Sequence, residues 1–158
     1  MSLAPKPASA SFTEMVQVVL PNDANPMGFM LGGAVMHLID IAGAIAAFRH
    51  AHALVVTAAV DGLEFLSPVK VGDFIILKAR VTATFTTSLE VEVKVYSEEA
   101  LTGLRQLTSQ AYLTFVTLER GGARAAIPPL AIETGEDREF QEAALARREA
   151  HLARRARL

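Results

Sequence analysis

The sequence predicts an α+β fold in which an antiparallel β-sheet wraps around a long central helix, with a second helix at the C-terminal end. Three observations lead to this prediction. The segment 33–52 is almost entirely apolar, as a helix enclosed by protein would be. Long segments rich in β-branched residues follow it, separated by short turns. The segment 134–158 combines many charges with alanine, which is typical of a surface helix.

The N-terminal part of the chain leads into the central helix. Residues 1–11 are small and include prolines, so we expect them to be disordered. Phe12–Leu20 is expected to form the first strand, because its β-branched run is ended by a proline. A loop rich in Pro, Asn and Gly follows. The helix then runs from about Gly33 to about His52, with cationic side chains at its C-terminal end.

Four further strands are expected at 55–65, 74–84, 88–97 and 106–118. The third of these alternates strictly, which predicts one face buried on the helix and the other in solvent. In the tail, acidic residues at the start and arginines at the end suit the dipole of a second helix. We therefore divide the chain into a domain over 12–130 and a helical tail over 131–158.

Composition excludes several classes of function. The chain has 158 residues, a net charge of −2 and no cysteine, so a general nucleic-acid binder, a disulfide framework and thiolate catalysis are not expected. His50 and His52 would point to different sides of a helix, so no metal site is predicted. The N-terminus lacks a secretory signal, and the Gly33–Phe48 run is shorter than the ~20 residues of a membrane span. We expect a cytoplasmic protein with no membrane partner.

Asp40 is the most informative residue, because it is a carboxylate in an otherwise apolar helix. Burying an ionised carboxylate without a partner costs several kcal/mol, at about the scale of a whole domain's stability. Such an aspartate is therefore either tied into a polar network or held in a pocket for chemistry. His37 lies one turn before it and is interpreted as a packed helix histidine.

The Gly32-Gly33 pair precedes Asp40 at the start of the same helix. Glycines let a ligand approach the backbone, and the N–H groups of the first turn favour developing negative charge, such as an oxyanion. Asp40 would lie about 10 Å further along the axis. The two features could act together if a substrate spans them or if a second chain supplies one of them. Alternatively, the glycines only permit close packing.

The chain resembles the hotdog-fold acyl-CoA thioesterases of the bacterial YciA type and the brain-type cytosolic acyl-CoA hydrolases. The resemblance rests on the run DAN-x-x-G-x-x-x-GG, which holds Asn25, on Asp40 with Gly43 behind it, and on VVTAAVDGLEF. It continues through TTSLEVEV, AYLTFVTL and the tail IPPLAIETGEDREF. The resemblance implies that 12–130 is a hotdog thioesterase domain.

The resemblance also implies a site shared between two chains. Asp40 matches the catalytic carboxylate of the family and Asn25 its partner asparagine, while backbone N–H groups near Gly32 and Gly33 would hold the thioester oxygen. Asp40 of one chain would work with Asn25 of the other, so a homodimer is the expected minimum unit and a homohexamer, a trimer of dimers, the expected assembly. No cofactor is implied beyond the coenzyme A of the substrate. Glu64 departs from the family, which has asparagine there.

Coenzyme A carries phosphates, so cations are expected at the mouth of the site. The candidates are Arg105, which matches an arginine in relatives, with Lys70 and Arg80. Thr57 is a candidate for main-chain bonds to the pantetheine amides, and Ser88 for contact with the nucleotide.

A hotdog domain is also compatible with two functions other than acyl-CoA hydrolysis. A hotdog dehydratase or hydratase is disfavoured because the His-Phe-Pro motif of those enzymes is absent. A non-catalytic acyl-CoA-binding or regulatory module is disfavoured because both Asn25 and Asp40 are present. The carboxylate could act as a general base or attack the thioester directly, and both routes stay open.

Overall fold

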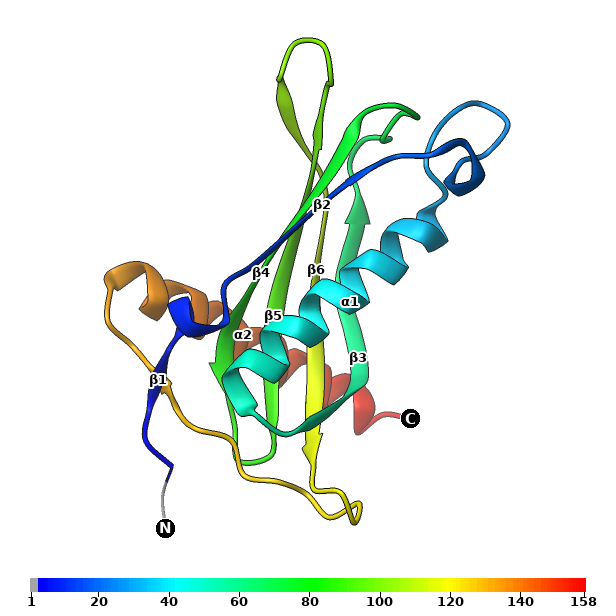
Figure 1. Ribbon diagram of the computed structural model, residues 1–158. Coiled ribbons are helices and arrows are strands. Elements are labelled where there is room, and N and C mark those ends of the chain that lie inside the picture. Colours follow the sequence, from blue (N-terminus) through cyan, green and yellow to red (C-terminus); the bar gives the residue numbers. More distant parts are fainter. Residues whose placement is uncertain (1–2) are drawn as a thin grey trace.

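The computed structural model describes residues 3–158, which form two helices packed on opposite faces of one main sheet (Figure 1). The strands and helices in chain order are β1 (Lys6–Pro7), η1 (Ala8–Ser11), β2 (Thr13–Val18), η2 (Pro21–Asp23), α1 (Gly32–Ala51), β3 (Leu54–Phe65), β4 (Phe74–Thr84), β5 (Ser88–Glu98), β6 (Arg105–Leu118), β7 (Leu130–Ala131) and α2 (Gly135–Arg155).

The main sheet has five strands in the order β2-β4-β5-β6-β3, with every neighbouring pair antiparallel. The predicted α+β fold, with its sheet around a long central helix and its C-terminal helix, is thus confirmed. Strands β2 and β3 form the two edges of the sheet. β3 contains an irregularity between Thr57 and Ala59, where Ala58 is an extra residue relative to β6.

The core lies between α1 and the concave face of the sheet. Small residues on the helix allow close approach: a Cβ at Gly43 would come within 3.2 Å of the Phe115 ring. The alternation predicted for β5 is confirmed on this face, where four apolar side chains are fully buried. The core members from the helix and the three central strands are Val35, Leu38, Ile39, Ala42, Ala46, Ala47, Ala51, Ile75, Leu77, Ala79, Val81, Leu89, Val91, Val93, Val95, Ala111, Leu113 and Phe115.

The other face of the sheet is less open to solvent than the alternation predicts, because α2 covers part of it. Glu90 and Glu92 are buried there. Arg147 of α2 pairs with Glu90 at 2.8 Å and stacks on the Tyr112 ring, 3.6 Å from its centroid. Burial opposes the charge on Arg147, but the hydrogen bond to Glu90, together with the charges of Glu90, Tyr112 and Glu92, outweighs it and raises the pKa of Arg147. Charged and aromatic contacts therefore hold α2, whose only buried residue is Ala144.

The N-terminal segment differs from its expected disorder. From residue 3 onward it has a defined path, and only residues 1–2 lie outside the description. β1 pairs with β7 in a small parallel sheet, and the Lys6 amine donates to the carbonyls of Arg49 and His50 at 2.7 and 2.9 Å. A lysine at that place satisfies orphan carbonyls at the end of α1.

By length and apolar composition alone, α1 is long enough to cross a membrane, because it reaches 20 residues and exceeds the run counted in the sequence. The sequence analysis expected the apolar run to be too short for a membrane span, and the observed length of α1 does not support that argument. The packing of α1 against the sheet makes it the core helix of this domain.

Candidate functional site

Asp40 is held by a hydrogen bond from the neighbouring strand. The Thr57 hydroxyl of β3 donates to Asp40 Oδ1 at 2.6 Å. No hydrogen bond from within residues 3–158 reaches Oδ2. A carboxylate oriented by one donor, with its other oxygen available, suits a general base or a nucleophile. The sequence analysis missed this role of Thr57; the available signal was a lone hydroxyl in an apolar strand facing the helix.

A cleft of about 340 Å³ opens beside Asp40. We call it the Asp40 cleft. Its walls are mostly apolar, and its only charged or titratable side chains are Asp40 and His37. Its lining residues are Gly33, Met36, His37, Ile39, Asp40, Thr57, Val60, Leu63 and Leu113. The geometry suits an apolar group placed next to a single carboxylate.

Asn25 lies in the tight loop before α1, and its side chain has a fixed orientation. Its Oδ1 accepts hydrogen bonds from the backbone N–H groups of Met27 and Phe29, at 3.0 and 3.2 Å. Because Oδ1 is occupied by hydrogen bonds from the loop, the Nδ2 amide group is the part of the side chain that can bind other partners. The turn needs Gly28, whose φ of 84° lies in the left-handed region. Asn25 is therefore prepared to donate.

A second cleft of about 370 Å³ contains Asn25 together with Gly32 and Phe65. We call it the Asn25 cleft. Asp40 does not line it, and Asn25 does not line the Asp40 cleft. Within one chain the two side chains that the sequence analysis paired thus face different clefts.

The first turn of α1 contributes to both clefts, because Gly32 lines one and Gly33 the other. Ala34 and Val35 donate their N–H groups to the Leu31 carbonyl, which leaves those of Gly32 and Gly33 at the open end of the helix. A Cβ at Gly33 would meet no atom within 4 Å in the described chain. Packing within this chain therefore does not require glycine there.

One long face of α1 is uncovered, contrary to the expectation that protein surrounds this helix. Asp40 and His37 are exposed, and the nearby apolar residues of α1 and β3 keep 44–48% of their surface exposed. These apolar residues are Met36, Phe48, Leu54, Val56 and Val60. The face adjoins the free edge of β3. An open strand edge beside exposed apolar side chains is typical of a surface that pairs with another chain.

The residues predicted to bind coenzyme A lie in different parts of the structure. Arg105 pairs with Glu98 at 2.7 Å, and this hydrogen bond raises the pKa of Arg105. Lys70 is exposed and bridges to Phe29 through its backbone, next to the Asn25 loop. Ser88 Oγ accepts a long hydrogen bond of 3.4 Å from Arg148 of α2.

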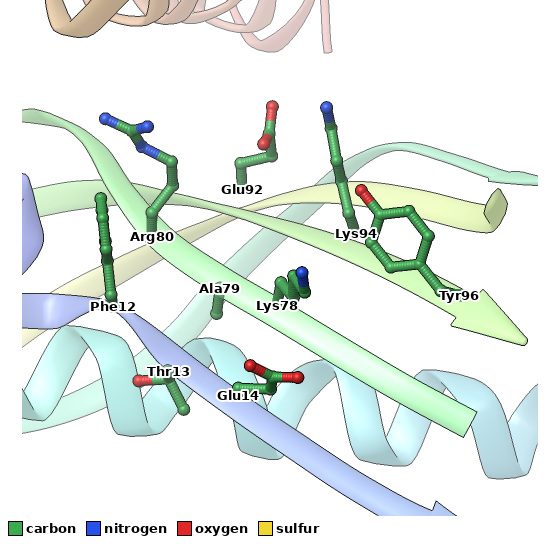
Figure 2. Close-up of a pocket in the computed structure, with 9 residues that line it drawn as sticks. All are labelled: Phe12, Thr13, Glu14, Lys78, Ala79, Arg80, Glu92, Lys94 and Tyr96. Atoms are coloured by element: carbon green, nitrogen blue, oxygen red, sulfur yellow. The ribbon is translucent and has the colours of Figure 1, made fainter. Parts of the chain in front are cut away.

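Arg80 lies on the face of β4 turned away from α1 (Figure 2). It donates to Asp137 at 2.8 Å and stacks on Phe140, 4.1 Å from the ring centroid. The hollow drawn in Figure 2 holds about 470 Å³ and mixes charges of both signs. Although it is larger than the Asp40 cleft, it contains neither Asp40 nor Asn25. We therefore place the candidate active site at the Asp40 cleft.

Within residues 3–158, no group of three or more His, Asp or Glu side chains is arranged to hold a metal ion. His50 is buried and its Nε2 lies 2.7 Å from the Pro128 carbonyl, so Nε2 carries the proton. Its role is structural, at the end of α1.

The known proteins to which the chain is similar are acyl-CoA thioester hydrolases and thioesterases. The Thioesterase superfamily model matches residues 27–103. The chain is 39% identical to the uncharacterized acyl-CoA thioester hydrolase YkhA of Bacillus subtilis, over 75% of this chain and 69% of that protein. It is 35% identical to the acyl-CoA thioester hydrolase YciA of Escherichia coli, over 70% and 86%. It is 32% identical to the human cytosolic acyl coenzyme A thioester hydrolase, but spans only 38% of that protein.

Solved structures agree in fold. A hexameric acyl-CoA thioesterase superposes with a TM-score of 0.93 at 38% identity, covering 98% of this chain and 99% of its own. An acyl-CoA hydrolase of Staphylococcus aureus, solved with butyryl coenzyme A and coenzyme A, has a TM-score of 0.89 at 36% identity, covering 96% and 93%. Variants of the Staphylococcus enzyme with an aspartate, an asparagine or a threonine replaced by alanine have also been solved.

Proposed function

The chain belongs to the acyl-CoA thioester hydrolases of the thioesterase superfamily, and we propose that Asp40 is the residue with which it hydrolyses acyl-CoA to a free acid and coenzyme A. The observation that carries this proposal is the Thr57–Asp40 hydrogen bond of 2.6 Å at the wall of a mostly apolar cleft. A thioester is already activated toward attack, so an oriented carboxylate and a water molecule suffice. No metal or cofactor is required by this proposal.

Each polar group has a proposed role. Thr57 orients Asp40, whose Oδ2 takes a proton from the attacking water or attacks the carbonyl carbon itself. The Nδ2 amide group of Asn25 and the first-turn N–H groups of α1 donate to the carbonyl oxygen of the thioester. This oxygen becomes negative as the tetrahedral intermediate forms. Two observations support these roles. The Oδ1 atom of Asn25 is occupied by hydrogen bonds from its loop, which leaves Nδ2 for the substrate. A Cβ at Gly33 would meet no atom within 4 Å, so a substrate has room beside this residue.

We propose that a second copy of the chain completes the site. Asn25 and Asp40 of one chain line different clefts, and the face of α1 that holds Asp40 is apolar and uncovered. A copy seated on this face and on the β3 edge would bring its Asn25 to the Asp40 of the first chain. The proposed minimum unit is a homodimer, and the hexameric relative supports a trimer of dimers. The cytosolic human relative supports a cytoplasmic location.

A thiol-release assay tests the function. Purified protein is incubated with acyl-CoAs from acetyl to palmitoyl, and free coenzyme A is measured. We expect catalytic release with at least one chain length. Binding of acyl-CoA without any thiol release across the series would favour the non-catalytic binding module instead.

A further inference from the structure

Two serine hydroxyls of the Asn25 cleft have no hydrogen-bond partner in the chain. Ser67 Oγ and Ser109 Oγ are both buried, and neither forms a hydrogen bond within residues 3–158. Both residues line the Asn25 cleft. Because an unpaired buried hydroxyl costs free energy, two of them in one cleft indicate a ligand that supplies the missing partner.

Ser109 occupies a place that the rest of its strand fills with apolar side chains. Every second residue of β6 faces α1, and Ala111 and Leu113 of this row are fully buried members of the core. Ser109 continues the row and is only 1% exposed. The neighbouring Thr108, in contrast, donates its hydroxyl to the Val95 carbonyl at 3.1 Å. Hydrogen bonding within the described chain therefore accounts for the hydroxyl of Thr108 but not for that of Ser109.

The remaining walls of the Asn25 cleft are mostly apolar. Met30, Phe65 and Val69 are among them, and none of the described residues that line the cleft is charged. Apolar walls with two free hydroxyls suit an uncharged, mainly aliphatic group that carries an oxygen atom.

The acyl chain is the part of the substrate that fits this description. Asn25 and Gly32 line the same cleft, and the proposed function assigns their N–H groups to the thioester oxygen. From the thioester, the substrate continues on one side into the pantetheine arm and on the other into the acyl chain. The pantetheine arm leads to charged phosphates, which are costly to bury, so this arm must lead outward. Only the acyl chain can end at a hydroxyl as deeply buried as that of Ser109.

We propose that the Asn25 cleft binds the acyl chain and that Ser67 and Ser109 select acyl-CoAs whose chain carries a hydroxyl or oxo group. This inference rests on the proposed function. Each serine can donate to an oxo oxygen, and can donate to or accept from a hydroxyl. A plain aliphatic chain would leave both serines unpaired, and a site that leaves buried polar groups unpaired discriminates against such a substrate.

The test compares butyryl-CoA and hexanoyl-CoA with their hydroxy and oxo derivatives in the thiol-release assay. We expect kcat/KM of the native protein for at least one derivative to exceed that for its parent chain about tenfold. Ser109→Ala should lower this ratio about tenfold, and Ser67→Ala should lower it in the same direction. Differences in the intrinsic reactivity of the thioesters cancel when one pair of substrates is compared between native and variant protein.

Two controls separate substrate selection from a structural role of the serines. Ser97→Ala, on β5 and outside the cleft, is the matched variant and should keep the native ratio. Thermal unfolding gives the second control. Because the hydroxyl of Ser109 has no partner in the described chain, Ser109→Ala should unfold at the same temperature as the native protein or a higher one. A marked loss of thermal stability would mean that the hydroxyl serves the fold and would overturn the proposal.

Binding to Asp40→Asn distinguishes this inference from the proposed function. Calorimetry should show about tenfold tighter binding of the favoured derivative than of its parent chain, and adding Ser109→Ala should abolish the difference. If no acyl-CoA is hydrolysed but this Ser109-dependent difference persists, the proposed function fails and the role of the serines stands. If no derivative is favoured in rate or affinity, or if the preference survives in both serine variants, the role assigned to the serines is wrong, whether or not the parent chains are hydrolysed.

Discussion

At the scale of single residues, the proposed chemistry depends on which oxygen of Asp40 is occupied. Thr57 binds Oδ1 and so fixes the plane of the carboxylate. Asn25 is bound by its own loop through its oxygen and can only donate to a substrate. Thr57 therefore orients the proposed base, and Asn25 donates to the thioester oxygen.

Replacement of Asp40 by Asn should keep the fold and lower kcat by about a hundredfold or more, the scale of a lost general base or nucleophile. The side chain is exposed in one chain, so its substitution removes no core packing. Steady-state kinetics and thermal unfolding check both parts. Asp73→Asn, in a turn away from the cleft, should behave like the native protein. Near-normal turnover in Asp40→Asn would refute the assignment.

Thr57 is proposed as a positioning residue, and its hydroxyl can be removed without changing its shape. In Thr57→Val, kcat should fall about tenfold, because Oδ1 loses a hydrogen bond to a charged group, while the KM of acyl-CoA stays within about twofold. Thr57→Ser retains a hydroxyl and should restore most of kcat. If KM rises and kcat is preserved, Thr57 binds substrate and does not orient Asp40.

At the scale of secondary structure, the C-terminal end of α1 is fastened by a buried histidine and a lysine. Burial lowers the pKa of His50, and the nearby Lys6 charge adds to this, against the opposing bond to the Pro128 carbonyl. A depressed pKa means that the unfolded chain binds the proton more readily. The stability contributed by neutral His50 is therefore present above about pH 6.5 and is lost as the pH falls through the lowered value.

The predicted consequence is a pH-dependent difference between the native protein and His50→Gln, whose amide can still donate to Pro128. The native protein should lose stability relative to this variant below pH 6.5, by at most about 1.4 kcal/mol per pH unit. Urea unfolding at a series of pH values measures it. His52→Gln, which removes an exposed imidazole, is the control. Parallel pH curves for His50→Gln and the native protein would contradict the prediction.

At the scale of the whole molecule, the chain leaves uncovered the helix face on which its proposed base lies. This explains how an aspartate can occupy so apolar a helix: within one chain Asp40 is not buried. A second copy would supply the missing cover and the missing Asn25 together, so assembly and activity should be linked.

Subunit mixing tests this link. Asp40→Asn and Asn25→Ala chains should each have low activity, and Asn25→Ala should change stability little because it alters a loop. If the site draws these residues from different subunits, a mixed dimer contains one intact site. Co-refolding should then restore up to about a quarter of native activity, since about half of the dimers are mixed. Parental activity despite demonstrated subunit exchange would mean that both residues act within one chain.

The sequence by itself determined the long helices and the five strands of the main sheet. Apolar composition set the extent of α1, strict alternation set the core face of β5, and charge asymmetry indicated α2, because these depend on local periodicity and propensity. The sequence also singled out Asp40, since a carboxylate in an apolar helix is visible without a structure. The path of residues 3–11 was not visible, because the β1–β7 pairing joins segments far apart in the chain.

Only the tertiary structure decided how side chains from different elements meet. The Thr57–Asp40 hydrogen bond exists because β3 packs beside α1. Asn25 and Asp40 are separate because the loop before α1 and the exposed face of α1 line different clefts. The pairing of Arg80 with Asp137 and of Arg147 with Glu90 depends on where α2 docks. In sequence these arginines are indistinguishable from surface charges, because whether a charge is neutralised is decided by neighbours in space and not by neighbours along the chain.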